Sequence, residues 1–329
     1  MTTSSTHSTA DTESQRTGTF RPDASLIGVA LIWGVNMPIM KIGLEQLDPF
    51  VFNALRLVIS ASCLVTFALR DWRRGVRPAP GLKPQQILTY TVLVAGLYQV
   101  CFLTGIARTT AGNTGLIMAT VPAWTALLAR LFIGERLQRL AWGGLTLALS
   151  GTVIVALQKG DLSTGQEHLT GNLLILSAAL TWAAGTVYSR PLLKSIAPMQ
   201  LSASAATIAL PVHLLLATGS YAESGPALQS VNLWLILLYA GVLSSGLSLP
   251  MWNFGVRHAG AAHAAAVQNL IPVIAITAAW FIRAETPTPY QVFGGVLIVS
   301  GLVIMRLGRR TVEASEPEEA VQAAPATDG

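Results

Sequence analysis

The chain has 329 residues, of which 52% belong to the hydrophobic set AVILMFWYC and only 11% are charged. Soluble domains carry roughly 25% charged residues, so this sequence lacks the polar surface of a water-soluble protein. The composition therefore argues against a cytosolic enzyme and against a disordered chain, and the spacing of the charges decides how the apolar residues are used.

The two ends of the chain differ from its body. Residues 1–24 are rich in Ser and Thr, have no apolar core and include Asp11 and Glu13, so they match neither a secretory signal nor a transit peptide. We expect a disordered cytoplasmic tail there. Residues 311–329 carry five acidic side chains and no Lys or Arg, which is typical of a second disordered cytoplasmic tail.

Between these tails, long stretches without Lys, Arg, Asp or Glu follow one another along the chain. Two apolar spans lie at about 25–44 and 50–69, and eight later stretches hold 19 to 33 uncharged residues each. A helix needs about 20 apolar residues to cross the hydrocarbon core of a bilayer. The sequence therefore predicts an all-α integral membrane protein with ten transmembrane helices.

Lys and Arg gather on one side of the predicted bilayer. With a cytoplasmic N-terminus, sixteen of them fall inside and four outside, as expected for loops that retain Lys and Arg in the cytoplasm. We therefore expect both termini inside and, by elimination, a bacterial plasma membrane. The predicted partners are the lipid bilayer and a small-molecule substrate. No nucleic acid is expected, because the basic residues do not cluster with aromatics on one face, and a homo-oligomer is left open.

The two halves of the chain are similar to each other. A shift of 149 positions superposes Trp33 on Trp182 and Pro49 on Pro198. A shift of 150 superposes further pairs: Pro122 and Pro272, Glu135 and Glu285, Gly144 and Gly294, and Ser150-Gly151 and Ser300-Gly301. Because each half has five spans, the second copy enters the membrane from the opposite side. We predict a first repeat at 25–158 and an inverted second repeat at 168–307, with the substrate site between them near the midplane.

Motifs in both halves resemble a known family. The first half contains Trp33-Gly34-x-Asn36, Pro49 with Arg56, Pro122 followed by Gly134-Glu135-Arg136-Leu137, and Gly144 with Ser150-Gly151. These motifs look like the EamA-type module of the drug/metabolite transporter superfamily, and the second half resembles the same module. The resemblance implies a ten-helix carrier for small metabolites, often an exporter of amino acids or drug-like compounds. The halves differ where Ala205 stands opposite Arg56 and Ala284 opposite Gly134.

Two ionisable residues fall inside predicted spans, where a charge costs about 2.5 to 3.5 kcal/mol at mid-helix. Arg56 lies seven residues after Pro49, about 10 Å along its helix. Its guanidinium suits a substrate carboxylate, although it also has the reach to snorkel to the interface or to cap a neighbouring helix. His213 lies in the seventh span, and histidine titrates near pH 6.5 when unperturbed, which suits proton coupling. A hydrogen-bonded core histidine is the alternative.

Uncharged polar and aromatic side chains complete the predicted substrate cavity. They are Trp33, Asn36, Tyr98, Gln99, Trp182, Tyr188, Asn253, Gln268 and Asn269. Such amides also bond between helices without contacting a substrate. Gln268 and Asn269 precede Pro272, where a proline frees a backbone carbonyl and favours local unwinding. Glu135 and Glu285 end matching spans, so we expect structural capping or pairing with an Arg, with a proton relay as the alternative.

Signatures of enzymes and cofactor sites are missing from the sequence. It has no G-x-x-x-x-G-K-[ST] loop for ATP and no His-Glu-x-x-His motif. Cys63 and Cys101 lie in apolar runs and support neither a disulfide framework nor a metal site. We therefore predict no catalytic residue, no metal and no cofactor. The favoured function is a secondary transporter that exports small organic metabolites; the alternatives are a membrane-embedded enzyme acting on a lipid and a non-transporting membrane partner.

Overall fold

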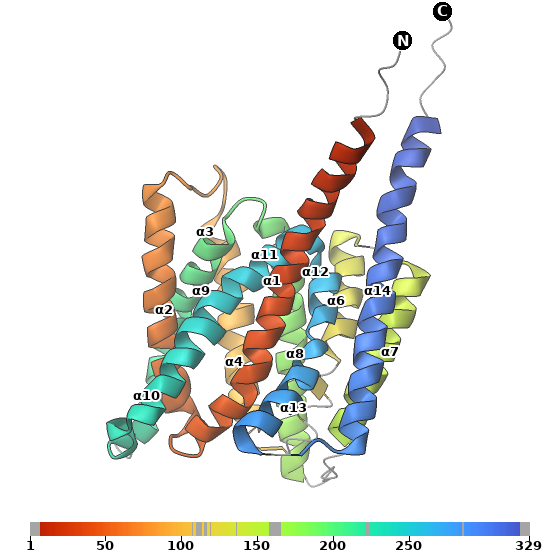
Figure 1. Ribbon diagram of the computed structural model, residues 1–329. Coiled ribbons are helices and arrows are strands. Elements are labelled where there is room, and N and C mark those ends of the chain that lie inside the picture. Colours follow the sequence, from red (N-terminus) through yellow and green to blue (C-terminus); the bar gives the residue numbers. More distant parts are fainter. Residues whose placement is uncertain are drawn as a thin grey trace, which may run out of the picture.

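A computed structural model of the protein describes residues 7–106, 108–109, 114, 117–118, 120–135, 137–157, 166–221, 224–284 and 286–322. Within these ranges every regular element is a helix, and the helices are long rods packed side by side (Figure 1). The prediction of an all-α fold is confirmed for this part of the chain.

The described part of the first half includes five continuous helical stretches. They are α1 (His7–Leu44), α2 (Pro49–Arg73), a continuous rod of α3 (Pro84–Thr91), η1 (Val92–Leu97) and α4 (Tyr98–Ile106), then α6 (Val121–Ile133) and α7 (Arg139–Leu157).

The start of α2 shows how the sequence sets these boundaries. Asp48 accepts hydrogen bonds from the backbone N–H groups of Phe50 and Val51 at 2.9 and 3.3 Å, and Pro49 occupies the first turn, where its missing N–H costs nothing.

The second half repeats this pattern. Its helices are α8 (Gln166–Leu192), α9 (Pro198–Tyr221), the 3₁₀ turn η3 (Ala227–Gln229), a continuous rod of α10 (Val231–Leu238), η4 (Tyr239–Leu247) and α11 (Ser248–Ala259), then α12 (Ala261–Val267), α13 (Leu270–Arg283) and α14 (Pro289–Gln322). The helix is interrupted between α12 and α13 at Gln268 and Asn269, where the sequence predicts local unwinding. Both η1 and η4 are π-helical and occupy corresponding places in the two halves.

Several helices are long and apolar enough to cross a bilayer. In the part of the chain that the structure describes, seven such stretches are Arg21–Leu44, Pro49–Arg73, Pro84–Gly105, Leu169–Leu192, Pro198–Tyr221, Val231–Ala259 and Ala261–Ile282, and two shorter apolar helices are Val121–Ile133 and Pro289–Met305. Large apolar side chains lie on the outer surface, including Phe132 at 75% and Phe281 at 78% exposure. Such a surface suits lipid rather than water. The protein is therefore a multi-pass membrane protein.

The helices α7 and α14, which end the two halves, pack directly against each other (Figure 1). A side chain added at Gly144 would meet the carbonyl oxygen of Gly301 at 2.5 Å, and one added at Gly151 would meet that of Gly294 at 2.5 Å. The earlier residue of one helix thus meets the later residue of the other, so the two helices run antiparallel. This is the orientation expected for corresponding helices of inverted repeats.

The two repeats interleave around a common core. In corresponding contacts, α1 packs against α11 and α13, whereas α8 packs against α4 and α6. The largest buried cluster accordingly draws on both halves and includes Trp182 and Trp252, with Trp33 packed against it. The space between the repeats is therefore lined by residues from both.

The start of α1 and the end of α14 point to the same end of the molecule (Figure 1). Because α1 begins at His7 and α14 ends at Gln322, helical backbone continues into both segments for which the sequence predicts tails. The prediction that residues 1–24 and 311–329 are disordered and cytoplasmic stays a prediction.

Candidate functional site

A cavity of about 710 Å³ lies between the two repeats. It reaches from Trp33 and Trp182 in the middle of the molecule to Lys41, Pro49 and Thr288 at one end, which we call the mouth end. Ligand pockets for small molecules typically occupy about 300 to 1,000 Å³. The cavity therefore has room for a small organic molecule.

Aromatic rings form the inner end of the cavity. The ring of Trp182 lies with its centroid 5.7 Å from that of Trp33 and 4.9 Å from that of Tyr98. Trp252 packs against both tryptophans from the core side, at 5.7 and 5.8 Å. The indole N–H of Trp33 donates to the carbonyl oxygen of Ser244, in the π-helical η4, at 2.9 Å. These contacts fix a rigid apolar surface against which a ligand can pack.

Arg56 supplies a positive charge to the wall of the cavity. It lies on α2, and its Nη2 donates to the side-chain oxygen of Asn53 at 2.5 Å and to that of Gln99 at 3.4 Å. Its Nε atom is buried and has no hydrogen-bond partner. Lys41 is a second cation in the lining, and no Asp or Glu occurs among the described residues that line the cavity. The described lining is therefore electropositive.

His213 lies behind Arg56 rather than in the cavity lining. Its side chain is almost fully buried on α9, with 2% exposure. Nε2 lies 2.7 Å from the carbonyl oxygen of Ala95 in η1, and Nδ1 lies 3.3 Å from Nδ2 of Asn53. Because Asn53 also contacts Arg56, one chain of hydrogen bonds connects the histidine with the arginine at the cavity wall.

Buried polar atoms without a partner concentrate at this cavity. Among the described side chains six such atoms occur, and five belong to cavity-lining residues: Asn36 Oδ1, Arg56 Nε, Trp182 Nε1, Gln268 Oε1 and Asn269 Nδ2. A buried polar group without a partner is costly, and such groups are rare in native interiors. Three of these atoms are donors and two are acceptors. The cavity wall therefore holds unpaired donors and acceptors that lie just beneath its surface.

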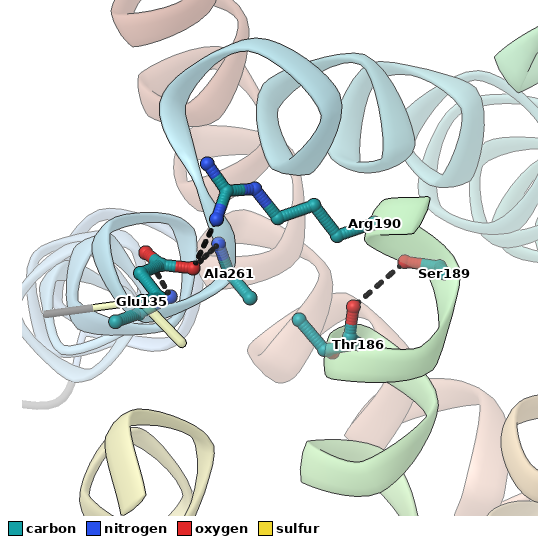
Figure 2. A network of polar contacts seen from close by, with 6 residues as sticks. Glu135, Thr186, Ser189, Arg190 and Ala261 are labelled. Carbon is teal, nitrogen blue, oxygen red and sulfur yellow. Dashed lines mark hydrogen bonds and ion pairs between the residues drawn. The ribbon is translucent and has the colours of Figure 1, made fainter. Parts of the chain in front are cut away.

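The opposite end of the molecule, which we call the latch end, is closed by a polar contact between the repeats (Figure 2). Glu135 follows α6, and its carboxylate accepts from Arg190 Nη1 at 2.8 Å. The same carboxylate accepts from the backbone N–H groups of Ala261 and Ala262 at 3.1 and 3.3 Å. A carboxylate at a helix N-terminus satisfies free N–H groups and the helix dipole. Glu135 thus ties the end of α6 to α8 and to the start of α12.

A second contact between the repeats lies at the same end. His263 on α12 and Asp23 on α1 approach to 2.9 Å, and their side chains are 9% and 14% exposed. Gly260 precedes α12 with a φ of +93°, and a side chain there would meet Oε1 of Glu135 at 2.5 Å. The positive φ favours glycine at this position, and the missing side chain leaves room for the Glu135 carboxylate.

Corresponding residues have different environments at the two ends. Ala129 on α6 is fully buried near the latch end. Its counterpart under the 150-residue shift, Ala279 on α13, lines the cavity and is partly exposed. The two ends are built from related sequence, but the cavity reaches only one of them in this structure.

Comparison with known proteins shows the family. The family model described as "EamA-like transporter family" matches residues 21–157 and again residues 169–307. The chain belongs to the EamA-like transporter family. Membership of a transporter family makes this EamA-like protein a transporter and excludes the alternative of a lipid-modifying enzyme.

Curated relatives match the EamA-like protein over nearly their whole length. One is the "Uncharacterized transporter YoaV" of Bacillus subtilis, 27% identical over 84% of this chain and 94% of that protein. Another is the "Probable amino-acid metabolite efflux pump" of Salmonella typhimurium, 26% identical over 87% and 96%. A third is the "Probable terminal-alkyne amino-acid exporter" of Streptantibioticus cattleyicolor, 26% identical over 89% and 96%.

A solved structure, titled "Crystal structure of protein", shares the fold of this EamA-like protein. Its TM-score is 0.71 and its sequence identity 18%, and the match covers 87% of this chain and 99% of that one. At this identity the likeness concerns the fold alone.

The structure brings most of the predicted cavity residues of the EamA-like protein together. Those that line the cavity are Trp33, Asn36, Arg56, Tyr98, Gln99, Trp182, Gln268 and Asn269. Asn253 is absent from the lining and is fully buried between helices, where it bonds to Tyr90 and Ser202; its contact with substrate stays a prediction. Tyr188 is also absent from the lining and packs against the buried core instead. Glu285 lies outside the described residues.

Sequence reasoning missed two features of the site. Asn53 was not singled out, although it lies three residues before Arg56 and therefore on the same face of α2. The second feature is the pair of π-helical segments, η1 and η4. Their carbonyl groups at Ala95 and Ser244 accept from the side chains of His213 and Trp33. Nothing in the apolar sequence of either segment distinguishes it from an ordinary α-helix.

Proposed function

We propose that this EamA-like protein is a secondary transporter that exports small organic metabolites carrying a carboxylate group, such as amino acids. It would cross a bacterial inner membrane ten times as two inverted five-helix repeats, with both termini in the cytoplasm. In that orientation the latch end faces the cytoplasm and the mouth end faces the outside. Two relatives whose names refer to amino-acid export support this substrate class.

The observation that carries this proposal is the set of unpartnered polar atoms around the cavity. Arg56 Nε and Asn269 Nδ2 are donors suited to a carboxylate, while Asn36 Oδ1 and Gln268 Oε1 are acceptors suited to an ammonium or hydroxyl group. The Trp33 and Trp182 rings offer an apolar surface for the rest of the molecule. A ligand with a carboxylate, a donor group and an apolar body would complement this wall once small side-chain rotations bring these atoms to its surface.

Alternating access is the mechanism that fits the difference between the two ends. For export, substrate must enter from the cytoplasm, and the cavity would then have to open at the latch end. Opening there separates Glu135 from Arg190 and from the N–H groups at the start of α12. The related sequence at the mouth end would then take up the closed arrangement, as expected for inverted repeats.

Substrate binding is tested first by thermal shift of the detergent-purified protein with a panel of L-amino acids, simple carboxylic acids, organic cations and sugars. A ligand stabilises the protein by mass action. We expect carboxylate-bearing hits that are lost in Arg56→Ala and retained in Arg108→Ala, which removes an exposed arginine. Uptake of the hit into proteoliposomes should show the same pattern. Hits confined to cations or sugars would contradict the proposal.

The closed latch end is tested by cysteine labelling. Ala129→Cys, in a background with Cys63→Ala and Cys101→Ala, places a thiol at a fully buried position of α6. We expect Glu135→Ala to increase its labelling by a membrane-impermeant maleimide from the cytoplasmic side. Asp71→Ala removes another carboxylate, near the end of α2, and should leave the labelling unchanged. Equal labelling in the two variants would refute the role of Glu135 in closing this end.

A further inference from the structure

Four groups form an unbroken chain of hydrogen bonds beside the cavity. The carbonyl oxygen of Ala95 lies 2.7 Å from His213 Nε2, and His213 Nδ1 lies 3.3 Å from Asn53 Nδ2. The side-chain oxygen of Asn53 accepts from Arg56 Nη2 at 2.5 Å. Asn53 and His213 are each 2% exposed, so water does not compete for these bonds. The chain starts in η1, crosses α9 and ends on α2.

The chemistry of these groups fixes where the hydrogens lie. A carbonyl oxygen only accepts, so His213 Nε2 must carry the hydrogen that it donates to Ala95. In a neutral imidazole the other nitrogen, Nδ1, is then an acceptor. Asn53 must therefore turn its NH₂ group toward His213, which leaves its oxygen for the Arg56 guanidinium. This orientation of the amide is assigned from the network, because no other arrangement satisfies every member.

Protonation of His213 would reverse this arrangement. An imidazolium donates from both nitrogens, so Nδ1 would then need an acceptor. Asn53 can provide one only by turning its oxygen toward His213. Its NH₂ group would then face the guanidinium of Arg56, where two donors meet. Arg56 would lose its shortest hydrogen bond and keep only the longer contact with Gln99.

The surroundings of His213 contain few other groups that titrate. Helix α9 packs against α2, α3, η1 and α11. From α2, Arg56 is the charged group that interacts electrostatically with His213. The phenols on this side are Tyr90 on α3, which is buried, and Tyr98 at the start of α4, which lines the cavity; neither changes charge between pH 5 and 8. The ionisable residues of α11, Arg257 and His258, lie exposed at its last turn.

We infer that His213 is a positioning residue for Arg56: neutral His213 orients Asn53 to hold the guanidinium at the cavity wall, and protonated His213 releases it. The inference deepens the proposed function and rests on it in one respect, the binding of substrate by Arg56. The histidine thereby makes the presentation of the guanidinium sensitive to protons, although it does not touch the cavity itself.

The test measures the position of Arg56 without a substrate. Phenylglyoxal modifies arginine side chains, and peptide mass spectrometry reports the rate at Arg56 relative to the exposed Arg257 in the same sample of full-length protein. We expect the relative rate to rise by about tenfold between pH 8 and pH 5, the factor that follows from losing one hydrogen bond to a charged group. The intrinsic pH dependence of the reagent cancels in the ratio.

Three variants separate positioning from folding. His213→Gln keeps an acceptor for Asn53 and a donor for Ala95 but does not titrate, so Arg56 should stay protected at every pH. His213→Leu removes both bonds, so Arg56 should react fast at every pH. His258→Gln removes an exposed histidine whose Nδ1 contacts the Phe254 carbonyl at 2.9 Å, and it should behave like the wild type.

Two results would overturn the inference. A flat wild-type profile would refute release by protonation, and slow labelling of His213→Leu at pH 8 would refute positioning. Neither depends on transport. Ligand binding by Arg56→Ala tests the proposed function separately. If this variant still bound the ligand while the labelling of Arg56 followed the expected pattern, the proposed function alone would be refuted.

Discussion

The packing of α7 against α14 gives a sharp prediction from two adjacent glycines. Gly144 faces α14, where an added Cβ would lie 2.5 Å from the carbonyl oxygen of Gly301 and 2.6 Å from the backbone nitrogen of Met305. Gly143 faces open space, with no atom within 4 Å of the same added group. We therefore expect Gly144→Ala to destabilise the protein and Gly143→Ala to leave it intact or stabilise it.

The size of the effect follows from the geometry. Ordinary contact begins at 3.4 Å, so a Cβ at Gly144 is about 0.9 Å too close to its neighbours. Those neighbours are backbone atoms, which cannot rotate away, so the helices must separate. Overpacking costs about 1 to 3 kcal/mol, while replacing glycine by alanine in a helix gains up to about 1 kcal/mol. Both variants share that gain, so their difference isolates the overpacking.

The measurement is the free energy of unfolding of both variants in mixed micelles, from titration with a denaturing detergent. The Gly144→Ala protein should be less stable than the Gly143→Ala protein by about 1 to 3 kcal/mol. A difference near zero would show that α7 and α14 do not pack as closely as described.

Three further predictions concern other positions. Ala284 and Gly134 occupy corresponding helix ends with left-handed backbone, at φ of 54° and 67°. Ala284→Gly should therefore raise the free energy of unfolding by about 1 kcal/mol, and Gly134→Ala should lower it by a similar amount. Unchanged melting temperatures in both variants would contradict this. Asn253→Ala leaves the buried hydroxyl of Tyr90 unpaired and should lower the free energy of unfolding by about 1 to 3 kcal/mol. Ligand affinity in the thermal-shift assay should stay constant, and a selective loss of affinity would place Asn253 at the site. Gly260→Ala should destabilise the protein more than Gly75→Ala. Both positions have positive φ, but only at Gly260 would the added Cβ meet another side chain, that of Glu135. Equal losses in melting temperature would show that the Glu135 side chain moves aside at no cost.

Much of the architecture is predictable from residue spacing alone. The charge-free stretches indicate where the helices lie, and the shift that superposes Trp33 on Trp182 pairs two residues whose rings lie 5.7 Å apart in the structure. A match in sequence register becomes a contact here because the two repeats interleave around one buried core. The shift of 150 likewise superposes Gly144 on Gly294 and Gly151 on Gly301, the glycines at which α7 and α14 meet.

The choice among the polar residues of the site is less accessible to sequence reasoning. Asn36 and Asn253 are indistinguishable as amides within apolar spans. Asn36 lines the cavity, whereas Asn253 is engaged by Tyr90 and Ser202, which are 163 and 51 residues away along the chain. Such partners depend on how distant helices are rotated, and hydrophobic periodicity does not report that rotation when every face is apolar.

The glycine contacts of α7 and α14 have a consequence for how such a chain is assembled. Gly144 meets Gly301 and Gly151 meets Gly294, and under the 150-residue shift each of these pairs is the image of the other. Gly144 contacts Gly301, and the counterparts of these two residues, Gly294 and Gly151, contact each other as well. An interface of this kind is isologous and is found in two-fold symmetric dimers. This contact is thus self-complementary: one repeat makes it with what is, in structure, a second copy of itself.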